Sequence, residues 1–528
     1  MANKTNKERN QELLERRREI ASMGGAAAVE KHKKSGRATA RERLEMLFDK
    51  GTFVEIDAHV KHHATDFGLD KKTIPADGVV TGFGDVNGRK VGVFSQDFTS
   101  SGGSLGEMHA RKIVKIMDLA IASKVPLVGI NDSGGARIQE GIKSLAGYGD
   151  IFLRNTRASG VIPQISVILG PSAGGAVYSP ALTDFVFTVD KITKMFITGP
   201  EVIKTVLGEE ISMEELGGAM VHNEVTGNAH FFATSEKECF EQVRTLLGYL
   251  PSSSSQLPPL LPAGSNSDVS PSEKDVNSVI PDDPKKPYDV RDIIKSVFDG
   301  GVFFEVQKYY AMNLVVGFAR LDGRTVGVVA NQPRVLAGVL DVDSSDKAAR
   351  FIRFCDAFNI PLVTFVDIPG YLPGVDEEHK GVIRHGAKVL YAYSEATVPK
   401  LTVIVRKAYG GGYIAMCSRH LGADFVFAYP TAEIAVMGPL GAANIIFKKE
   451  IESSPDPEKT RKEKMEEYSM KFASPYVAAS LGYVDDVILP EETRLRLSRA
   501  LDLLKDKRKP ISPSGGEGLK KFHGNIPL

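Results

Sequence analysis

Glycine-rich turns are the feature of this sequence most able to do chemistry. They lie at residues 133–136 (SGGA), 172–175 (SAGG), 408–412 (AYGGG) and 437–439 (MGP). Each follows an apolar run and precedes a predicted helix, whose first N–H groups have no partner within the helix. Without side chains in the way, such N–H groups can approach an oxyanion closely. We expect one oxyanion site at Gly174 and Gly175 and another at Gly411 and Gly412, although tight turns alone would use the same glycines.

A competing interpretation centres on Ser172. Residues 170–174, GPSAG, match the G-x-S-x-G turn that carries the nucleophile of many serine hydrolases. Such a serine needs a histidine and an acid. The downstream histidines available by position are His222, His230, His385 and His420. The second half of the chain has no serine in the matching place, whereas both halves keep a pair of glycines. The shared feature favours backbone donors, and the hydrolase remains the alternative.

The chain contains an internal repeat. Residues 82–94 (GFGDVNGRKVGVF) and 317–329 (GFARLDGRTVGVV) are identical at seven of thirteen positions. The same spacing matches Asp132 with Asp367, and residues 167–175 resemble residues 403–412. Two copies are too few for a solenoid, so duplicated globular domains are the better interpretation. We predict an N-terminal domain over residues 1–250, a linker rich in Ser, Pro and Asp over residues 251–287 and a C-terminal domain over residues 288–528.

Each half is predicted to contain the same order of elements. Two alternating strands are joined by a polar turn, and an amphipathic helix and a short apolar strand follow. The turns are residues 85–88 and 321–323, the helices 110–123 and 348–358, and the apolar strands 126–130 and 361–366. Continuously apolar strands are typical of buried parallel sheets. The pattern predicts an α/β fold built from β-β-α units.

Three further segments are predicted to be helical. A charged helix is expected over residues 7–34, and another begins at Thr39, where Glu42 completes a capping box. A polar helix is expected over residues 456–471, and we assign it no chemistry. Asp132 and Asp367 end the apolar strands, and their equivalent positions favour a structural role.

The composition excludes several classes of protein. Lys plus Arg and Asp plus Glu both number 66, so no net charge attracts nucleic acid or a membrane surface. The three cysteines form no C-x-x-C pair and the histidines lack metal-ligand spacing, so we expect no metal site. No apolar stretch reaches the roughly 18 residues that would span a bilayer. We therefore expect a cytoplasmic protein that is not inserted in a membrane.

Longer motifs resemble a known family. They are GRATARER at residues 36–43, DSGGARIQEG at 132–141, GPSAGGAVYSPAL at 170–182, AGVLDVDSSDKAARF at 337–351, FVDIPGYLPG at 365–374, RKAYGGGY at 406–413, AEIAVMGPLGAANIIF at 432–447 and HGNIPL at the end. Over nearly its whole length the chain resembles the carboxyltransferase (beta) subunit of biotin-dependent acyl-CoA carboxylases of the propionyl-CoA carboxylase type. Close relatives are the methylmalonyl-CoA decarboxylase alpha subunit and the transcarboxylase subunit.

The resemblance implies a fold, partners and site residues. It implies two tandem crotonase-like domains, a homo-hexamer built as a trimer of dimers, and a partner that carries biotin: a biotin carboxyl carrier, a biotin carboxylase subunit or a decarboxylase partner. Gly174 and Gly175 would hold the enolate oxygen of the coenzyme A thioester, and Gly411 and Gly412 the ureido oxygen of biotin. The remaining acyl-CoA positions would be Gly134, Gly135, Ala136, Ser172 and Ala173, and the remaining biotin positions Ala408, Tyr409, Gly410, Gly438 and Pro439.

The sequence departs from the family pattern in two places. Many relatives read Gly-Gly-Ala-Tyr where this chain has Gly412 before Tyr413, which keeps the N–H group. Ile414 occupies a position that sorts acyl-chain length in the family, and some propionyl-specific relatives have Asp there. The resemblance therefore leaves open which short acyl-CoA is preferred and whether the chain serves a carboxylase, a decarboxylase or a transcarboxylase.

Overall fold

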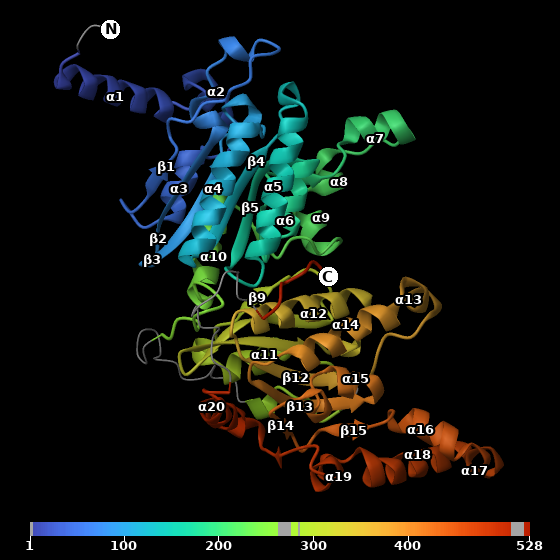
Figure 1. The fold of residues 1–528 in the computed structure, drawn as a ribbon. Coiled ribbons are helices and arrows are strands. Elements are labelled where there is room, and N and C mark those ends of the chain that lie inside the picture. The colour runs from blue at the N-terminus through green and yellow to red at the C-terminus, as the bar shows by residue number, and fades with distance from the viewer. Residues whose placement is uncertain (1–3, 262–275, 284–285, 508–521) are drawn as a thin grey trace. The chain divides into compact units, whose positions relative to one another are not determined.

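The chain forms two compact units. The computed structural model describes residues 4–261, 276–283, 286–507 and 522–528 (Figure 1). The first unit comprises residues 1–256 and 511–527, and the second comprises residues 257–510 and Leu528. The division falls inside the segment predicted to be a linker, part of which (residues 262–275 and 284–285) lies outside the described residues. Residues 522–527 belong to the first unit rather than to the predicted C-terminal domain. Within them Asn525 donates hydrogen bonds to Ser159 Oγ at 2.8 Å and to Asp184 Oδ1 at 3.0 Å.

The first unit is built on a mixed sheet in the order β1-β2-β3-β4-β5-β6-β8, with β7 paired to β5. The strands are β1 (Val54–Ile56), β2 (Val79–Val86), β3 (Arg89–Gln96), β4 (Leu127–Ser133), β5 (Gln164–Ala173), β6 (Phe185–Val189), β7 (Lys194–Phe196) and β8 (Phe231–Ala233). β2 and β3 form the predicted hairpin, because Asn87 and Gly88 adopt φ of 50° and 74° in its two-residue turn. From β3 to β8 the pairing is parallel.

The second unit repeats this sheet in the order β16-β14-β13-β12-β11-β10-β9, with β15 paired to β13. The strands are β9 (Phe304–Val306), β10 (Leu314–Leu321), β11 (Arg324–Asn331), β12 (Leu362–Ile368), β13 (Lys400–Tyr409), β14 (Phe425–Ala428), β15 (Glu433–Ala435) and β16 (Asp486–Val487). The turn between β10 and β11 again places two residues, Asp322 and Gly323, at positive φ (52° and 76°). The duplicated α/β architecture predicted from the sequence is confirmed.

Helices cover the sheets in each unit (Figure 1). In the first unit they are α1 (Asn6–Ala21), α2 (Ala26–Lys34), α3 (Ala40–Leu47), α4 (Glu107–Ser123), α5 (Ile142–Ala158), α6 (Gly175–Ala181), α7 (Pro200–Leu207), α8 (Met213–Gly217), α9 (Ala219–Glu224) and α10 (Glu236–Tyr249). In the second they are α11 (Val290–Val297), α12 (Val342–Ala357), α13 (Val375–Lys380), α14 (Val382–Glu395), α15 (Gly410–Ala415), α16 (Pro439–Ile446), α17 (Lys448–Ser453), α18 (Pro457–Tyr468), α19 (Pro475–Ser480) and α20 (Thr493–Leu503).

Two helix predictions can be compared with these bounds. The capping box is confirmed, because Thr39 caps α3 and the Glu42 side chain accepts the Thr39 N–H at 2.9 Å. The single helix predicted over residues 7–34 is wrong. It is split into α1 and α2 at Gly24 and Gly25, where Gly25 has φ of 89° and a side chain at Gly24 would collide with the carbonyl oxygen of Thr99.

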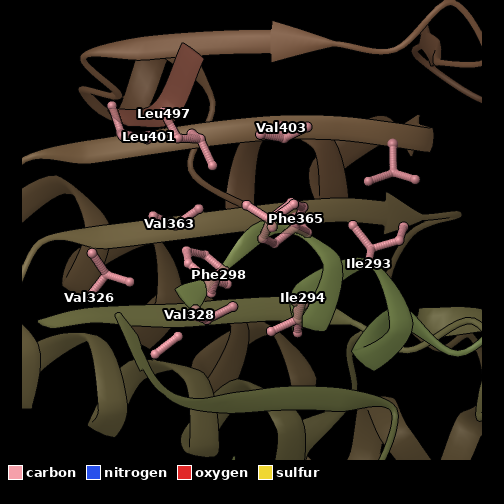
Figure 2. Close-up of a cluster of buried hydrophobic side chains, with 14 of the residues drawn as sticks. Ile293, Ile294, Phe298, Val326, Val328, Val363, Phe365, Leu401, Val403 and Leu497 are labelled. Atoms are coloured by element: carbon pink, nitrogen blue, oxygen red, sulfur yellow. The ribbon is translucent and has the colours of Figure 1, made fainter. Parts of the chain in front are cut away.

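A continuous apolar core supports the second sheet. Figure 2 shows Val363 and Phe365 of β12 beside Val403 of β13. The ring of Phe298, the residue that follows α11, lies 6.2 Å from the ring of Phe365. All seven residues of β12 are buried, as expected for a parallel strand covered on both faces. This rigid layer fixes the ends of β12 and β13, from which the candidate site is built.

Candidate functional site

Strand register shows which turns of the two units are equivalent. In the first unit Ile130 pairs with Val167 and Ser133 with Ser172. In the second unit Phe365 pairs with Val403 and Ile368 with Ala408. Counting two residues onward from Ser172 and from Ala408 makes Gly174 equivalent to Gly410, and Gly175 to Gly411. The sequence interpretation, which matched Gly174 and Gly175 with Gly411 and Gly412, is therefore wrong by one residue.

The backbone conformation agrees with this register. Gly174 and Gly410 end their strands with φ of 59° and 55°, a region that favours glycine. The N–H of Gly174 lies 3.2 Å from the carbonyl oxygens of both Phe196 and Ile197, so it is occupied within the protein. The N–H groups of the first turn that have no partner within the helix are therefore those of the first residues of α6, beginning with Gly175.

A second backbone segment supplies another donor to each turn. In the first unit Leu105 forms an isolated parallel bridge with Ala136: the Leu105 N–H donates to Gly135 O at 2.9 Å, and the Arg137 N–H donates to Leu105 O at 2.9 Å. In this bridge Leu105 uses its own N–H and C=O, whereas the bonds on the other side come from the neighbours of Ala136, so the Ala136 N–H points away from Leu105, towards the side of β4 that carries β5 and its turn. A Cβ at Gly135 would lie 3.1 Å from Ala173 O, which places this loop directly beside the turn.

The second unit repeats this arrangement with a different side chain. Leu340 bridges Tyr371 in parallel, with the Leu340 N–H on Gly370 O at 3.2 Å and the Leu372 N–H on Leu340 O at 2.7 Å. Tyr371 therefore takes the backbone place of Ala136. Sequence reasoning missed Tyr371, although the spacing of the repeats was sufficient to match it with Ala136.

The sequence analysis also placed residues 133–136 at the start of a helix, which is wrong because α5 begins only at Ile142.

Ser172 does not have the geometry of a nucleophile. Its side chain is fully buried, and within the described part of the chain its Oγ has no hydrogen-bond partner. His222, one histidine considered for it, is held by Thr226 Oγ1 and by Met195 O, both at 2.9 Å. A nucleophile must reach both its base and the substrate. The structure therefore gives no support to the serine hydrolase.

A cavity of about 730 Å³ opens next to the turn of the second unit. Three of the predicted biotin positions, Tyr409, Gly438 and Pro439, line it. Its other walls are Lys407, Glu433, Leu440, Gly441, Met465, Glu466, Ser469 and Met470. The last four come from α18 and the π-helix that continues it (Ser469–Ala473), so the segment to which no chemistry was assigned contributes one side of the cavity.

Two of the polar side chains that line this cavity, Tyr409 and Glu433, pair with each other. The Tyr409 hydroxyl donates a hydrogen bond to Glu433 Oε2. Burial, followed by this carboxylate, raises the pKa of Tyr409, so the phenol stays protonated in ordinary buffers. Gly438 is needed beside the ring, because a Cβ there would lie 3.2 Å from Tyr409 Cε2. Of the other predicted positions, Ala408 is fully buried in β13, whereas Ile414 on α15 is 41% exposed.

Among the described residues, no group of three His, Cys, Asp or Glu side chains is arranged to hold a metal ion. Cys239, Cys355 and Cys417 are buried and free of disulfides. None of the described helices has the length and apolar character needed to cross a membrane.

Comparison with known proteins gives a consistent result. Residues 31–515 match the family model of the carboxyl transferase domain. The chain is 56% identical to the methylmalonyl-CoA decarboxylase subunit alpha of Propionigenium modestum, with 98% of each chain covered. It is 54% identical to the propionyl-CoA carboxylase beta chain of Saccharopolyspora erythraea, over 98% of this chain and 95% of that protein. It is 53% identical to the methylmalonyl-CoA carboxyltransferase 12S subunit of Propionibacterium freudenreichii subsp. shermanii, over 98% and 97%.

A solved structure is similar over the whole length. A transcarboxylase 12S crystal structure, described as a hexamer assembly with methylmalonyl-coenzyme A and methylmalonic acid bound, aligns with a TM-score of 0.92 at 52% identity. The alignment covers 98% of this chain and 99% of that one. The likeness confirms the two tandem crotonase-like domains expected from the sequence.

Proposed function

The chain belongs to the carboxyl transferase family, and we propose that it moves a carboxyl group between carboxybiotin and a short acyl-CoA, either propionyl-CoA or methylmalonyl-CoA. One observation carries the proposal: each unit pairs an outward N–H at the start of a helix with an N–H of the loop after the preceding strand. These are Gly175 with Ala136 in the first unit, and Gly411 with Tyr371 in the second. Two matched donor pairs suit a reaction in which two reactants carry negative charge on oxygen.

In the first unit the donors would act on the acyl-CoA. Carboxyl transfer at the carbon beside a thioester passes through an enolate, and fixed N–H donors stabilise the charge on its oxygen. The N–H groups of Ala136 and Gly175 would supply these donors. Gly134, Gly135 and Ala173 would bring the backbone close to the thioester. Ser172 would act only through packing, because it is buried.

In the second unit the donors would hold the ureido oxygen of biotin. When bound, carboxybiotin supplies the carboxyl group and, after its release, a basic ureido nitrogen. The N–H groups of Tyr371 and Gly411 would stabilise the negative charge on the ureido oxygen. The cavity beside this turn fits such a ligand, because Leu440, Met465 and Met470 offer apolar walls to its aliphatic part. This role requires no side-chain base from the chain.

The chain is almost equally similar to three kinds of enzyme, which supports the proposal that it catalyses the half-reaction they share. The decarboxylase, carboxylase and transcarboxylase relatives are 56%, 54% and 53% identical. We therefore also consider a decarboxylase or transcarboxylase subunit, in which the same half-reaction runs from methylmalonyl-CoA to biotin. The partner that carries biotin would decide the direction. A homo-hexamer and a cytoplasmic location are part of the proposal.

The direct test is decarboxylation of methylmalonyl-CoA by the purified chain with free biotin as carboxyl acceptor. The proposal expects release of propionyl-CoA that depends on biotin and saturates with both substrates. Malonyl-CoA and ethylmalonyl-CoA, assayed in parallel, measure the acyl preference, and Ile414→Asp tests whether Ile414 affects it. Absence of biotin-dependent turnover with all three thioesters would reject the proposal.

A matched pair of variants tests the donor in the second turn. Gly411→Pro removes the N–H, whereas Gly411→Ala keeps it and adds a Cβ at an ordinary 3.8 Å from the Tyr371 ring. Proline is tolerated in the first turn of a helix. Removing one oxyanion donor lowers kcat by about 10² to 10³ in comparable sites. We expect that loss for Gly411→Pro relative to Gly411→Ala, and equal kcat in the two variants would contradict the assigned role.

A further inference from the structure

The two donor pockets are matched in backbone, and one of the side chains that differ between them belongs to the donor loop itself. Ala136 and Tyr371 occupy equivalent places in the two units. Ala136 forms a parallel bridge with Leu105, and Tyr371 forms the same bridge with Leu340. The first pocket therefore has a methyl group where the second has a phenol ring. A difference of this size directly beside the donors is sufficient to change which ligand fits.

The ring of Tyr371 lies against the turn. A Cβ built on Gly411 would lie 3.8 Å from Tyr371 Cε2 and 3.9 Å from Cδ2. On its other side the ring meets the backbone of α14, because a Cβ on Gly386 would lie only 2.8 Å from Cε1 and 3.0 Å from Cζ. The ring is thus enclosed between α14 and the turn and cannot move aside for a bulky reactant.

In the first unit the aromatic ring that contacts the turn belongs to helix α5 and not to the donor loop. A Cβ on Gly175 would lie 3.0–3.2 Å from the ring of Tyr148, which belongs to α5 and is 5% exposed. A tyrosine ring therefore packs against the equivalent glycine in each unit, Gly175 or Gly411, but only in the second unit does that tyrosine belong to the donor loop.

We propose that the side chain at this position, Ala136 in the first unit and Tyr371 in the second, determines which reactant each pocket accepts. The inference rests on the proposed function and deepens it. Ala136 leaves room beside the donors for the branched carbon chain of an acyl thioester. Tyr371 fills that room and offers a flat apolar wall, against which a planar ureido ring packs well. Burial raises the pKa of Tyr371 to about 12, so the wall is uncharged.

The test uses steady-state kinetics of biotin-dependent methylmalonyl-CoA decarboxylation by the full chain. For Tyr371→Ala we expect the KM for free biotin to rise tenfold or more, while the KM for methylmalonyl-CoA changes less than threefold. Tyr371→Phe, which keeps the ring, should bring the biotin KM back to within threefold of the original enzyme. The matched variant Ala136→Tyr should have the opposite effect, raising the KM for methylmalonyl-CoA tenfold or more with little change for biotin.

The outcomes separate this inference from the proposed function. If the original enzyme shows no biotin-dependent turnover, the proposed function itself fails. If it turns over but Tyr371→Ala changes both KM values equally, or only that for methylmalonyl-CoA, the role of Tyr371 is overturned. An unchanged methylmalonyl-CoA KM in Ala136→Tyr would overturn the role of Ala136. Should Tyr371→Ala fail to fold, Tyr371→Leu replaces it, because leucine fills more of the space and still removes the flat wall.

Discussion

Asp132 and Asp367 end the equivalent strands β4 and β12, and each carboxylate is held by a buried arginine. Arg43 Nη1 lies 2.8 Å from Asp132 Oδ2, and Arg406 Nε lies 3.0 Å from Asp367 Oδ2. Burial raises the pKa of both acids, to about 6 for Asp132, while the arginines oppose this shift. Arg43 also donates to Leu169 O at 2.8 Å, so it ties the end of β4 to β5 just before the first turn. These contacts support the structural role inferred for both acids.

The first prediction follows from the burial of Arg43. Its side chain also bonds Glu236, with Nε to Oε2 at 2.9 Å and Nη2 to Oε1 at 3.0 Å. Removing one partner of a buried ion pair costs about 3–5 kcal/mol, because a charge stays buried without compensation. Arg43→Met should lower the free energy of urea unfolding of the first unit by that amount. Arg111→Met, which removes an exposed pair with Glu107, should cost at most about 1 kcal/mol. Similar losses in the two variants would contradict the argument.

The second prediction concerns Gly174 and Gly410, which directly follow strands β5 and β13. Alanine is strained at positive φ, by about 1–3 kcal/mol. At Gly174 nothing but this strain opposes a Cβ, because the nearest atom, Ile197 O, is 4.0 Å away. At Gly410 the Cβ would also lie 3.0 Å from Val436 O. Gly410→Ala should therefore destabilise its unit more than Gly174→Ala does, as measured by urea unfolding midpoints. The reverse order would show that the turns differ in a way the static contacts do not describe.

The third prediction concerns acid stability of the first unit. Burial, assisted by the positive charges of Arg137 and Lys112, holds the pKa of His109 well below its ordinary value of 6.5. Below pH 6.5 the unfolded chain binds a proton at this residue that the folded chain does not, so stability is present above this pH and is lost as the pH falls. Each such site contributes a slope of about 1.4 kcal/mol per pH unit.

His109→Gln isolates this contribution. Glutamine cannot be protonated, so the free energy of unfolding of the variant should fall less steeply between pH 6.5 and pH 5 than that of the original protein. The difference in slope should approach about 1.4 kcal/mol per pH unit. Chemical denaturation over a pH series measures both slopes. Parallel slopes would mean that His109 is protonated in the folded state or remains neutral in the unfolded one.

Local patterns in the sequence were sufficient to predict most of the fold. Three predicted features arise from contacts between residues near in sequence, and all are confirmed. They are the capping box at Thr39, the hairpin turn at Asn87 and Gly88, and the apolar strand that leads to Asp132. The break at Gly25 was not predicted, because the charged pattern continues through it. It depends instead on the approach of Gly24 to Thr99, a contact between distant residues.

The site was predicted only in part for the same reason. Glycine pairs marked the turns, but the one-residue error in matching them was visible only through strand register. The proposed donor pair, Ala136 and Gly175, joins two segments that a strand and a helix separate. Tyr371 and Met465 gave no local signal of their own, since an aromatic or a methionine in an apolar pattern reads as core. The position of Tyr371 depends on how the loop after β12 packs beside the turn that follows β13, and that of Met465 on how helix α18 packs against α16.

The last prediction compares two buried lysines that are related by the internal repeat. Lys347 Nζ donates to four carbonyl oxygens, those of Gln307 at 3.0 Å, Tyr310 at 2.7 Å, Ala311 at 3.3 Å and Leu314 at 2.7 Å. Lys112 Nζ donates to two, those of Ala76 and Val79. Each lysine ties the irregular segment before the first long strand of its sheet to the helix that follows the hairpin.

Replacing each lysine by methionine keeps most of the volume and removes the donor. A buried polar group left without a partner costs about 1–3 kcal/mol. Lys347→Met should therefore destabilise the second unit by several kcal/mol, and Lys112→Met should destabilise the first unit by about half as much. Lys115→Met, at a residue with a half-exposed side chain on the same helix as Lys112, is the control and should cost at most about 1 kcal/mol. Urea unfolding followed separately for each unit measures these changes in the free energy of unfolding. Equal losses of stability in Lys347→Met and Lys112→Met would show that the number of carbonyl partners does not determine the stabilisation.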